Sequence, residues 1–270
     1  MTTPLNRREF IGTTLAGTAT AGSLVFGFPT RAAAQGAEPE VNAWVVVQAD
    51  EKVIIRIARS EMGQGTLTGL AQLVAEELDC DWNKVTTEHI LPGQNLANKR
   101  AWGDMSTGGS RGIRASVEYV RKGGAAARAM LIEAAAKQWG VPAGECTAAI
   151  SVITHKPSKK STSFGKVAEA AARLEAPKDV PLKNPKDWKV IGKPVKRLDT
   201  ADKLTGKQIY GADFRMPGML NATIRECPVF GGKVKSFDAA KVATMKGVKK
   251  VVQVGDTAVA VVADTWWQAK

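Results

Sequence analysis

Apolar and polar positions in the first half of the chain predict a sheet that is followed by a helix. Residues 43–48 and 53–58 are rich in valine and isoleucine and are joined by a short polar turn, which predicts a β-hairpin. From Leu67 to Leu78, apolar side chains recur every three or four residues, the spacing of one helix face. Residues 85–91 predict another strand. The pattern therefore indicates an α+β protein.

A polar loop over residues 92–106 precedes a second helical pattern. Apolar residues mark one face of a long helix from Ile113 to near Trp139, and the Gly-Val-Pro run at 140–142 predicts its end. Residues 148–154 then predict a single strand. Two helices, with a strand between them and another after them, are thus expected in this part of the chain.

Prolines and charged residues at 177–187 form a connector, where we place a domain boundary. Before it, Ser163 is expected to cap a short helix. Beyond it, residues 248–254 and 258–263 predict buried strands between glycine-containing turns. Asp264 is expected to cap a final helix of little more than one turn, which is marginal alone. We interpret the chain as a piece of a longer protein; the alternative is a natural C-terminus that docks on a partner.

Two glycine-bearing loops, each placed before a helical pattern, are the candidate binding elements. The first reads Glu-Met-Gly-Gln-Gly-Thr at 61–66, and the second reads Thr-Gly-Gly-Ser-Arg at 107–111. A helix start presents unpaired backbone N–H groups and the positive end of the peptide dipole, so it favours an anion. Glycine also lets the backbone approach a ligand closely. The pair could hold two ends of a long phosphorylated cofactor; the alternative is that both are ordinary tight turns.

The N-terminal segment predicts export. Asn-Arg-Arg-Glu-Phe-Ile at 6–11 is followed by a weakly polar stretch at 12–28 and by three alanines at 32–34, the order of a twin-arginine signal with its cleavage site. A plain secretory signal or a basic amphipathic tail are the alternatives. A membrane anchor is disfavoured because the apolar run is short and interrupted by threonine and glycine. We therefore expect a periplasmic protein whose signal occupies residues 1–34.

The net charge of +12 does not indicate nucleic-acid binding. The lysines are dispersed, and no aromatic residues interleave with the small cluster at Lys156, Lys159 and Lys160, as a single-strand binding groove requires. We interpret this cluster as a solvated face and expect no nucleic-acid partner. The basic character could still favour an anionic cofactor or an acidic redox partner.

Cysteine and histidine provide no metal site. Cys80, Cys146 and Cys227 are isolated and odd in number, so neither a disulfide framework nor a Cys-x-x-Cys site is expected. Cys80 ends an apolar helical stripe and is expected to be buried. His89 and His155 have no ligand-spaced partner, and His89 is expected to be structural. No metal held by protein side chains is predicted.

Taken together, the two loops resemble the molybdopterin-binding region of the xanthine dehydrogenase and aldehyde oxidase family. The resemblance rests on Met-Gly-Gln-Gly at 62–65 and on Thr-Gly-Gly-Ser-Arg at 107–111. Downstream, Gly-Lys-Pro at 192–194, Arg-Leu-Asp at 197–199 and Lys-Leu-Thr-Gly at 203–206 are similar to that family's hammerhead domain. The resemblance implies a partial molybdopterin-binding α/β region at 40–176, a linker at 177–187 and a truncated α/β hammerhead domain at 188–270.

This resemblance implies the large subunit of a molybdenum hydroxylase. Molybdenum would be held by the dithiolene of a molybdopterin, in the cytosine dinucleotide form, and the substrate would be an aldehyde or a nitrogen heteroaromatic such as isoquinoline. Iron–sulfur clusters need cysteine sets that this chain lacks, so a small [2Fe–2S] subunit is implied as a partner. A c-type cytochrome or a membrane electron acceptor is a further candidate partner, through which the protein would associate with a membrane.

The resemblance also assigns the cofactor-binding residues. They are Gly63, Gln64, Gly65, Gly108, Gly109, Ser110 and Arg111. The first three are expected near the pterin and the metal, and the other four at the phosphates, which a hydroxyl and a guanidinium both favour. The family's base is a glutamate near the far C-terminus, and this sequence lacks its motif, so no catalytic residue is assigned and no turnover is expected of this chain alone. Glu61 is expected to be solvated or to cap the helix.

Two other classes of function stay open. The first is an exported, non-catalytic binding module that reuses the fold, with glycine loops that are only structural. The second is a nucleotide-binding enzyme of the Rossmann type, which the sequence favours less because no Gly-x-Gly-x-x-Gly follows the first strand.

Overall fold

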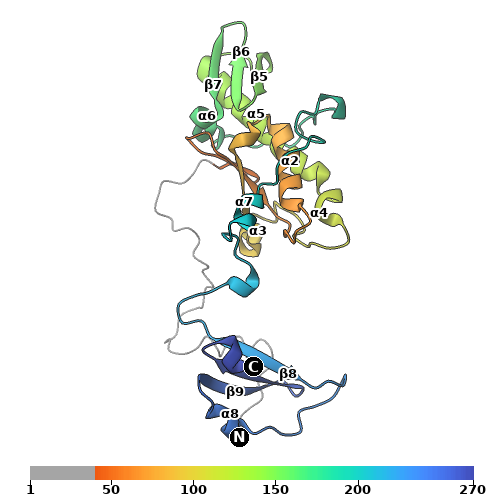
Figure 1. Ribbon diagram of the computed structural model, residues 1–270. Coiled ribbons are helices and arrows are strands. Elements are labelled where there is room, and N and C mark those ends of the chain that lie inside the picture. The colour runs from red at the N-terminus through yellow and green to blue at the C-terminus, as the bar shows by residue number, and fades with distance from the viewer. Residues whose placement is uncertain (1–39) are drawn as a thin grey trace. The chain divides into compact units, whose positions relative to one another are not determined.

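The computed structural model describes residues 40–270, which divide into two compact units, 40–208 and 209–270 (Figure 1). Both units combine helices and strands, which confirms the expected α+β class. The predicted export signal at 1–34 lies outside the described residues. Among the helices of the described part of the chain, none is long and apolar enough to cross a membrane.

The first unit is built on a four-stranded sheet with the order β1-β2-β3-β4. The strands β1 (Glu40–Asn42), β2 (Val45–Val47) and β3 (Val53–Ile57) are antiparallel neighbours, which confirms the predicted hairpin. The strand β4 (Val85–His89) runs parallel to β3. Parallel neighbours need a crossover connection, and α2 (Thr66–Leu78) supplies it. The carboxyl ends of β3 and β4 therefore lie side by side.

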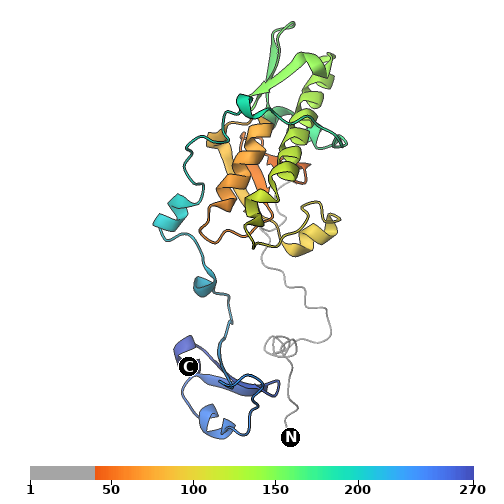
Figure 2. The same ribbon diagram turned by 90° about the vertical axis from the view of Figure 1, so that its right-hand side faces the viewer.

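The long helices α2 and α5 (Val117–Trp139) run side by side, as Figure 2 shows. Their close approach depends on Gly124, because a Cβ atom there would lie 2.4 Å from the carbonyl oxygen of Val74. The helix α5 ends at Gly140, whose φ of +68° confirms the predicted stop. Cys80 is buried, as predicted, and its burial raises the pKa of the thiol to about 12.

Among the local predictions for this unit, those for residues 148–154 and 92–106 are wrong. Residues 148–154 do not form one strand, because the chain turns at Ile150 and Ser151, with φ of +50° and +60°, between two strands. Residues 92–106 are not all loop, because a helix begins at Pro92, where the fixed φ of proline suits a first turn. The remaining elements of the first unit are η1 (Trp82–Lys84), α3 (Pro92–Ala97), α4 (Arg111–Arg114), η2 (Ala143–Glu145), the sheet of β5 (Cys146–Ala149), β6 (Val152–His155) and β7 (Lys160–Ser163), α6 (Phe164–Ala171), η3 (Pro185–Asp187) and α7 (Thr200–Leu204).

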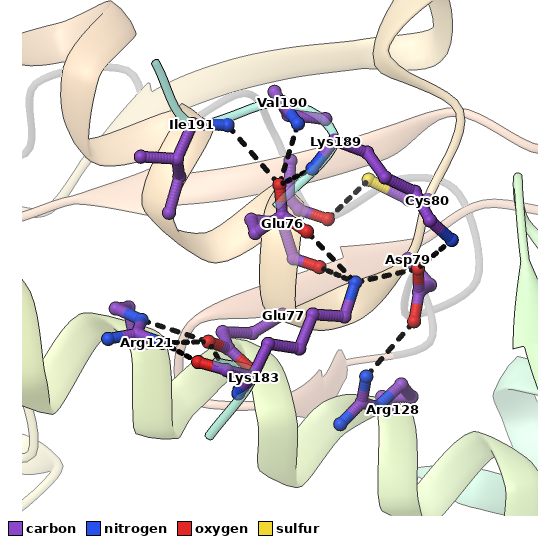
Figure 3. Close-up of polar contacts among 11 residues, drawn as sticks. Glu76, Glu77, Asp79, Cys80, Arg121, Arg128, Lys183, Lys189, Val190 and Ile191 are labelled. Atoms are coloured by element: carbon purple, nitrogen blue, oxygen red, sulfur yellow. Dashed lines mark hydrogen bonds and ion pairs between the residues drawn. The ribbon is translucent and has the colours of Figure 1, made fainter. Parts of the chain in front are cut away.

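The segment after the proline-rich connector is bound to the end of α2 by two buried carboxylates (Figure 3). One oxygen of Glu76 accepts hydrogen bonds from the backbone N–H groups of residues 189–191 at 2.8, 2.6 and 3.2 Å. Its other oxygen lies 3.0 Å from Nζ of Lys183. Glu77 pairs with Arg121 at 2.7 Å and accepts from the backbone N–H of Lys183 at 3.1 Å. The first compact unit thus extends past the connector.

The second unit contains a three-stranded antiparallel sheet with the order β8-β10-β9. The predicted strands at 248–254 and 258–263 are confirmed as β9 (Val248–Val254) and β10 (Ala258–Ala263), but their predicted burial holds mainly for β10, because only Val254 of β9 is buried. The final helix is capped by Thr265 rather than Asp264, because the Thr265 hydroxyl accepts from the N–H of Gln268 at 3.3 Å. The other elements are η4 (Gly211–Asp213), β8 (Asn221–Glu226), α8 (Ala239–Ala243) and α9 (Trp266–Ala269). The assignment of 188–270 to a hammerhead domain stays a prediction.

Candidate functional site

The first glycine loop, residues 61–66, connects the end of β3 to the start of α2. Gly63 and Gly65 have φ of +98° and +83°, in the left-handed region that favours glycine. A Cβ atom at Gly63 would meet no atom within 4 Å, and Gly63 and Gln64 are exposed. The Gln64 side chain folds back on the loop, with Oε1 2.5 Å from the N–H of Met62. The loop thus presents glycine backbone at the surface.

Glu61 occupies the N-terminal N–H groups of α2. Its carboxylate accepts hydrogen bonds from the N–H groups of Gly63, Gly65 and Leu67 at 2.7, 3.1 and 3.0 Å. Partial burial opposes ionisation, but these N–H groups and the nearby Arg197 outweigh it and hold the pKa of Glu61 below its usual value. The capping role expected for Glu61 is confirmed. The N–H groups of Gly65 and Leu67, two of the donors that we expected to favour an anion at this helix start, are therefore bound by the chain's own carboxylate.

Residues 197–199, which are distant in the sequence, form hydrogen bonds with the first loop and with the start of α2. Arg197 donates to the carbonyl oxygen of Gly63 at 3.0 Å and to Glu61 at 3.2 Å. Asp199 orients this guanidinium through bonds of 3.0 and 2.9 Å, and the same bonds hold the pKa of Asp199 well below its usual range. The N–H of Leu198 donates to the Thr68 hydroxyl at 3.1 Å. Sequence reasoning used these residues only as a family match and missed their contact with the loop.

The second loop opens a helix of only one turn. The helix α4 ends at Arg114, and α5 begins after Ser116, so the predicted continuous helix from Ile113 is wrong. Ser110 has a φ of +57° and makes no capping hydrogen bond with its side chain. One turn contributes little dipole, so affinity for an anion at this loop must come from side chains and local backbone.

Two guanidinium groups flank the exposed glycines of the second loop. Arg111 Nε donates to the carbonyl oxygen of Gly108 at 3.3 Å, and Arg114 donates to that of Gly109 at 3.3 Å. A Cβ atom at either glycine would meet no atom within 4 Å. Open glycine backbone, the Ser110 hydroxyl and two guanidinium groups form a donor set that suits phosphate oxygens.

The structure brings the two loops together. The N–H of Ser60, just before the first loop, donates to the Thr107 hydroxyl of the second loop at 2.9 Å. The helix starts also touch, because a Cβ atom at Gly112 would lie 3.0 Å from Oγ1 of Thr66. Loops some forty residues apart in the sequence thus form one surface in the first unit.

Arg59 lies buried between the loops, and sequence reasoning did not single it out. Its side chain is 3% exposed, Nε donates to Ser116 Oγ at 3.3 Å, and Nη2 donates to Tyr119 Oη at 3.2 Å. Nη1 donates to the carbonyl oxygen of Ser106 and lies 3.7 Å from the Asp104 carboxylate. The sequence signal that was available is an arginine directly after the predicted strand at 53–58 and two positions before Glu61.

A pocket of about 370 Å³ opens beside the first loop, at the carboxyl ends of β3 and β4. Ligands of α/β sheets often bind at such strand ends. Its lining includes Arg59, Glu61, His89 and Met105. His89 is exposed here, whereas His155 is buried and contacts Ser158 and Glu145 at 2.7 and 2.9 Å. The structural role that we expected of His89 therefore belongs to His155.

Comparison with known families gives a match over residues 7–214 to the molybdopterin cofactor-binding domain, more than half of the chain. The chain is also 32% identical over 292 residues to the beta subunit of isoquinoline 1-oxidoreductase from Brevundimonas diminuta, with 93% of this chain and 37% of the relative covered. It is 30% identical to a membrane-bound aldehyde dehydrogenase (pyrroloquinoline-quinone) from Gluconacetobacter polyoxogenes, covering 93% of this chain and 33% of the relative.

A nicotinate dehydrogenase subunit from Pseudomonas putida is 31% identical, with 86% of this chain and 20% of the relative covered. The chain thus spans about a third or less of the length of these relatives. Among solved structures, a Cu,Mo-CO dehydrogenase matches with a TM-score of 0.36 and 23% identity, over 47% of this chain and 15% of that one.

Proposed function

Because the chain belongs to the molybdopterin cofactor-binding domain family, we propose that it supplies part of the cofactor site of an exported molybdenum hydroxylase. The observation that carries this proposal is the contact between the two glycine loops in the first unit. A single surface with two glycine loops suits a ligand with two chemically different ends. The alternative of a non-catalytic module predicts a folded protein without bound cofactor.

The second loop is the phosphate end of the proposed site. Gly108 and Gly109 allow close approach, the Ser110 hydroxyl can donate, and Arg111 and Arg114 supply positive charge. These are the groups that a pyrophosphate needs, which fits molybdopterin cytosine dinucleotide.

The first loop is the neutral end of the proposed site. Glu61 binds the N–H groups of Gly63 and Gly65, so this loop offers a ring system the uncrowded surface at Gly63 and the neighbouring Gln64 and Gly65 rather than free backbone donors. When bound, the cofactor supplies the molybdenum centre at which the substrate is hydroxylated. The residues of this chain bind and orient that group, and Arg197 and Asp199 keep the loop in shape.

The names of the relatives guide the proposed substrate and partners. We propose an aldehyde or a nitrogen heteroaromatic such as isoquinoline as the substrate, since both kinds of enzyme are among them. Two of the relatives are named as subunits of larger enzymes, and we propose a [2Fe–2S] subunit as the partner of this protein. A c-type cytochrome or a membrane acceptor would follow it.

Cofactor analysis of the protein purified from its source tests the proposal. We expect molybdenum by elemental analysis and cytidine monophosphate after acid hydrolysis, in equal amounts. Folded protein with neither, or with pyrroloquinoline quinone instead, would refute it.

Substitution at the second loop locates the phosphate. In Ser110→Asp, a carboxylate would face the phosphate, a repulsion of about 4 kcal/mol at 4 Å with an effective dielectric of about 20. A third of that lowers affinity about tenfold. The matched control is Ser161→Asp, on an exposed strand away from both loops. Equal molybdenum content in the two folded variants would remove Ser110 from the site.

Export is tested separately. We expect Arg7→Lys combined with Arg8→Lys to retain the folded protein in the cytoplasm, because the paired arginines are the feature that a twin-arginine signal requires. Normal periplasmic accumulation of the double variant would contradict this part of the proposal.

A further inference from the structure

We infer that Arg59 is a positioning residue that sets the spacing of the two cofactor-binding loops. This inference rests on the proposed function, because it concerns the same ligand. Arg59 is the second residue before Glu61, at the point where β3 passes into the first loop. Its guanidinium donates to the carbonyl oxygen of Ser106, the residue immediately before the second loop.

The guanidinium of Arg59 joins separate parts of the chain. It donates to the carbonyl oxygen of Ser106 at the start of the second loop, and to the Ser116 and Tyr119 hydroxyls at the start of α5. The two hydroxyls lie 2.7 Å apart, so they form a fixed pair of acceptors. The planar fork of arginine suits several acceptors at once, which a lysine ammonium does not.

Burial makes these contacts obligatory. With 3% of its side chain exposed, Arg59 cannot exchange its partners for bulk water, and an unpaired buried charge is costly. The carboxylate 3.7 Å away belongs to Asp104, which also pairs with Arg111 of the second loop at 3.3 Å. The charge that balances Arg59 thus comes from the segment leading into the second loop, next to the proposed phosphate end.

Spacing matters because the ligand has two ends. A ligand that binds two sites at once gains about 10²–10⁴ in affinity over one contact, and loses this gain when the sites cannot be engaged together. The backbone contact from Ser60 to Thr107 lies next to Arg59, so movement of the Arg59 side chain changes the distance between the loops directly.

The chain offers a matched control in Arg56, which lies on β3 three residues before Arg59. Arg56 makes ion pairs with Glu40 and Glu88, both at 2.6 Å, and lies 5.9 Å from the centre of the Trp102 ring. These contacts stabilise the sheet and involve neither glycine loop. A lysine at either position removes an arginine fork from the first unit, but only the change at position 59 acts on the loops.

The experiment compares Arg59→Lys and Arg56→Lys in the cofactor-loaded protein. The measurements are molybdenum per polypeptide, the rate of molybdenum loss on dialysis, and Tm. We expect Arg59→Lys to lose cofactor at least about tenfold faster than wild type, and Arg56→Lys to retain it even where its Tm falls as far. Tyr119→Phe removes one acceptor of the Arg59 guanidinium. It should accelerate molybdenum loss less than Arg59→Lys does, with little change in Tm, and it tests the inference if Arg59→Lys does not fold.

Three outcomes overturn the inference: wild-type retention in Arg59→Lys, wild-type retention in Tyr119→Phe, or losses in both arginine variants that simply follow their Tm values. Failure of the proposed function looks different, because wild-type protein would then contain no molybdopterin at all.

Discussion

We expect Glu76→Gln to weaken the docking of residues 183–191 on α2 more than any other single-atom change there. In the native protein, one Glu76 oxygen accepts three backbone N–H groups and the other accepts from Lys183 (Figure 3). Glutamine replaces one of these oxygens with an NH₂ donor. Whichever way the amide turns, donors then face donors, either at residues 189–191 or at the Lys183 ammonium.

The magnitude follows from these contacts. Removing one partner of a buried ion pair costs about 3–5 kcal/mol, and a hydrogen bond to a charged group contributes about 1.5–3 kcal/mol. Because glutamine keeps one acceptor oxygen and the shape of the side chain, we expect a loss of about 3 kcal/mol in the free energy of unfolding of the first unit. In a unit of this size, that corresponds to a fall of roughly 6–12 °C in Tm.

The pH dependence of stability gives a second signature. Burial opposes ionisation of Glu76, but the N–H of Val190, the Lys183 ammonium and the adjacent N–H groups together lower the pKa of this carboxyl below 4.5. A lowered native pKa means that the stabilisation is present above the unfolded pKa and is lost as the pH falls through the native value. Wild type should therefore lose this part of its stability below about pH 4.5, and Glu76→Gln should lack that part of the acid dependence.

Calorimetry and hydrogen exchange measure these effects. Amides of residues 189–191 should exchange faster in Glu76→Gln, because they have lost their acceptor. The control is Glu133→Gln, which breaks an exposed pair with Lys137 on α5, at 3.2 Å, and should leave both Tm and exchange unchanged. Slow exchange at 189–191 together with a wild-type Tm in Glu76→Gln would refute the reasoning.

Two further predictions concern Glu61 and the thiols. Glu61→Ala should free the N–H groups of Gly63 and Gly65, so that added sulfate raises the Tm of the variant but not of wild type; equal responses in thermal melts would contradict this. Iodoacetamide at pH 8 should label the half-buried Cys227 and leave Cys80 unmodified, because burial raises the pKa of Cys80 to about 12; mass spectrometry of the native protein detects the reverse pattern directly.

The spacing of apolar residues predicted the helices and strands whose structure depends mainly on residues close in the sequence. The hairpin of β2 and β3 and the helix α2 are confirmed, because a buried face imposes its own period on the sequence. The turn at Ser151 could not be predicted in this way. Its left-handed backbone is held by distant partners, with the Ser151 N–H donating to the Asp79 carbonyl at 3.0 Å and its hydroxyl accepting from the Asp81 N–H at 2.9 Å.

In the candidate site, too, local features could be predicted from the sequence and features that depend on distant residues could not. The glycine loops could be located from sequence because positive φ and helix starts have local signatures. The residues that shape them could not, because Arg197 reaches Glu61 across 136 positions and Arg59 reaches Tyr119 across 60. The periodic spacing of apolar residues gives no information about contacts between residues so far apart in the sequence. The same limit explains the wrong prediction at Ser116, where a contact with Arg59 accompanies the break between α4 and α5.

In the proposed site, the contacts of Glu61 determine which end of the cofactor each glycine loop can bind. Both loops looked alike in sequence, since each places glycine before a helical pattern and so promises an anion site. In the folded chain, only the first loop opens a long helix, and there the carboxylate of Glu61 already accepts from the N–H groups of Gly65 and Leu67. A phosphate at that position would have to displace a carboxylate that Arg197 also holds. The second loop lacks the long helix but has Arg111 and Arg114 beside exposed glycines. In the proposed site, charge would therefore direct the anionic end of the cofactor to the second loop and leave the first for an uncharged ring, although helix geometry alone would have favoured the opposite orientation.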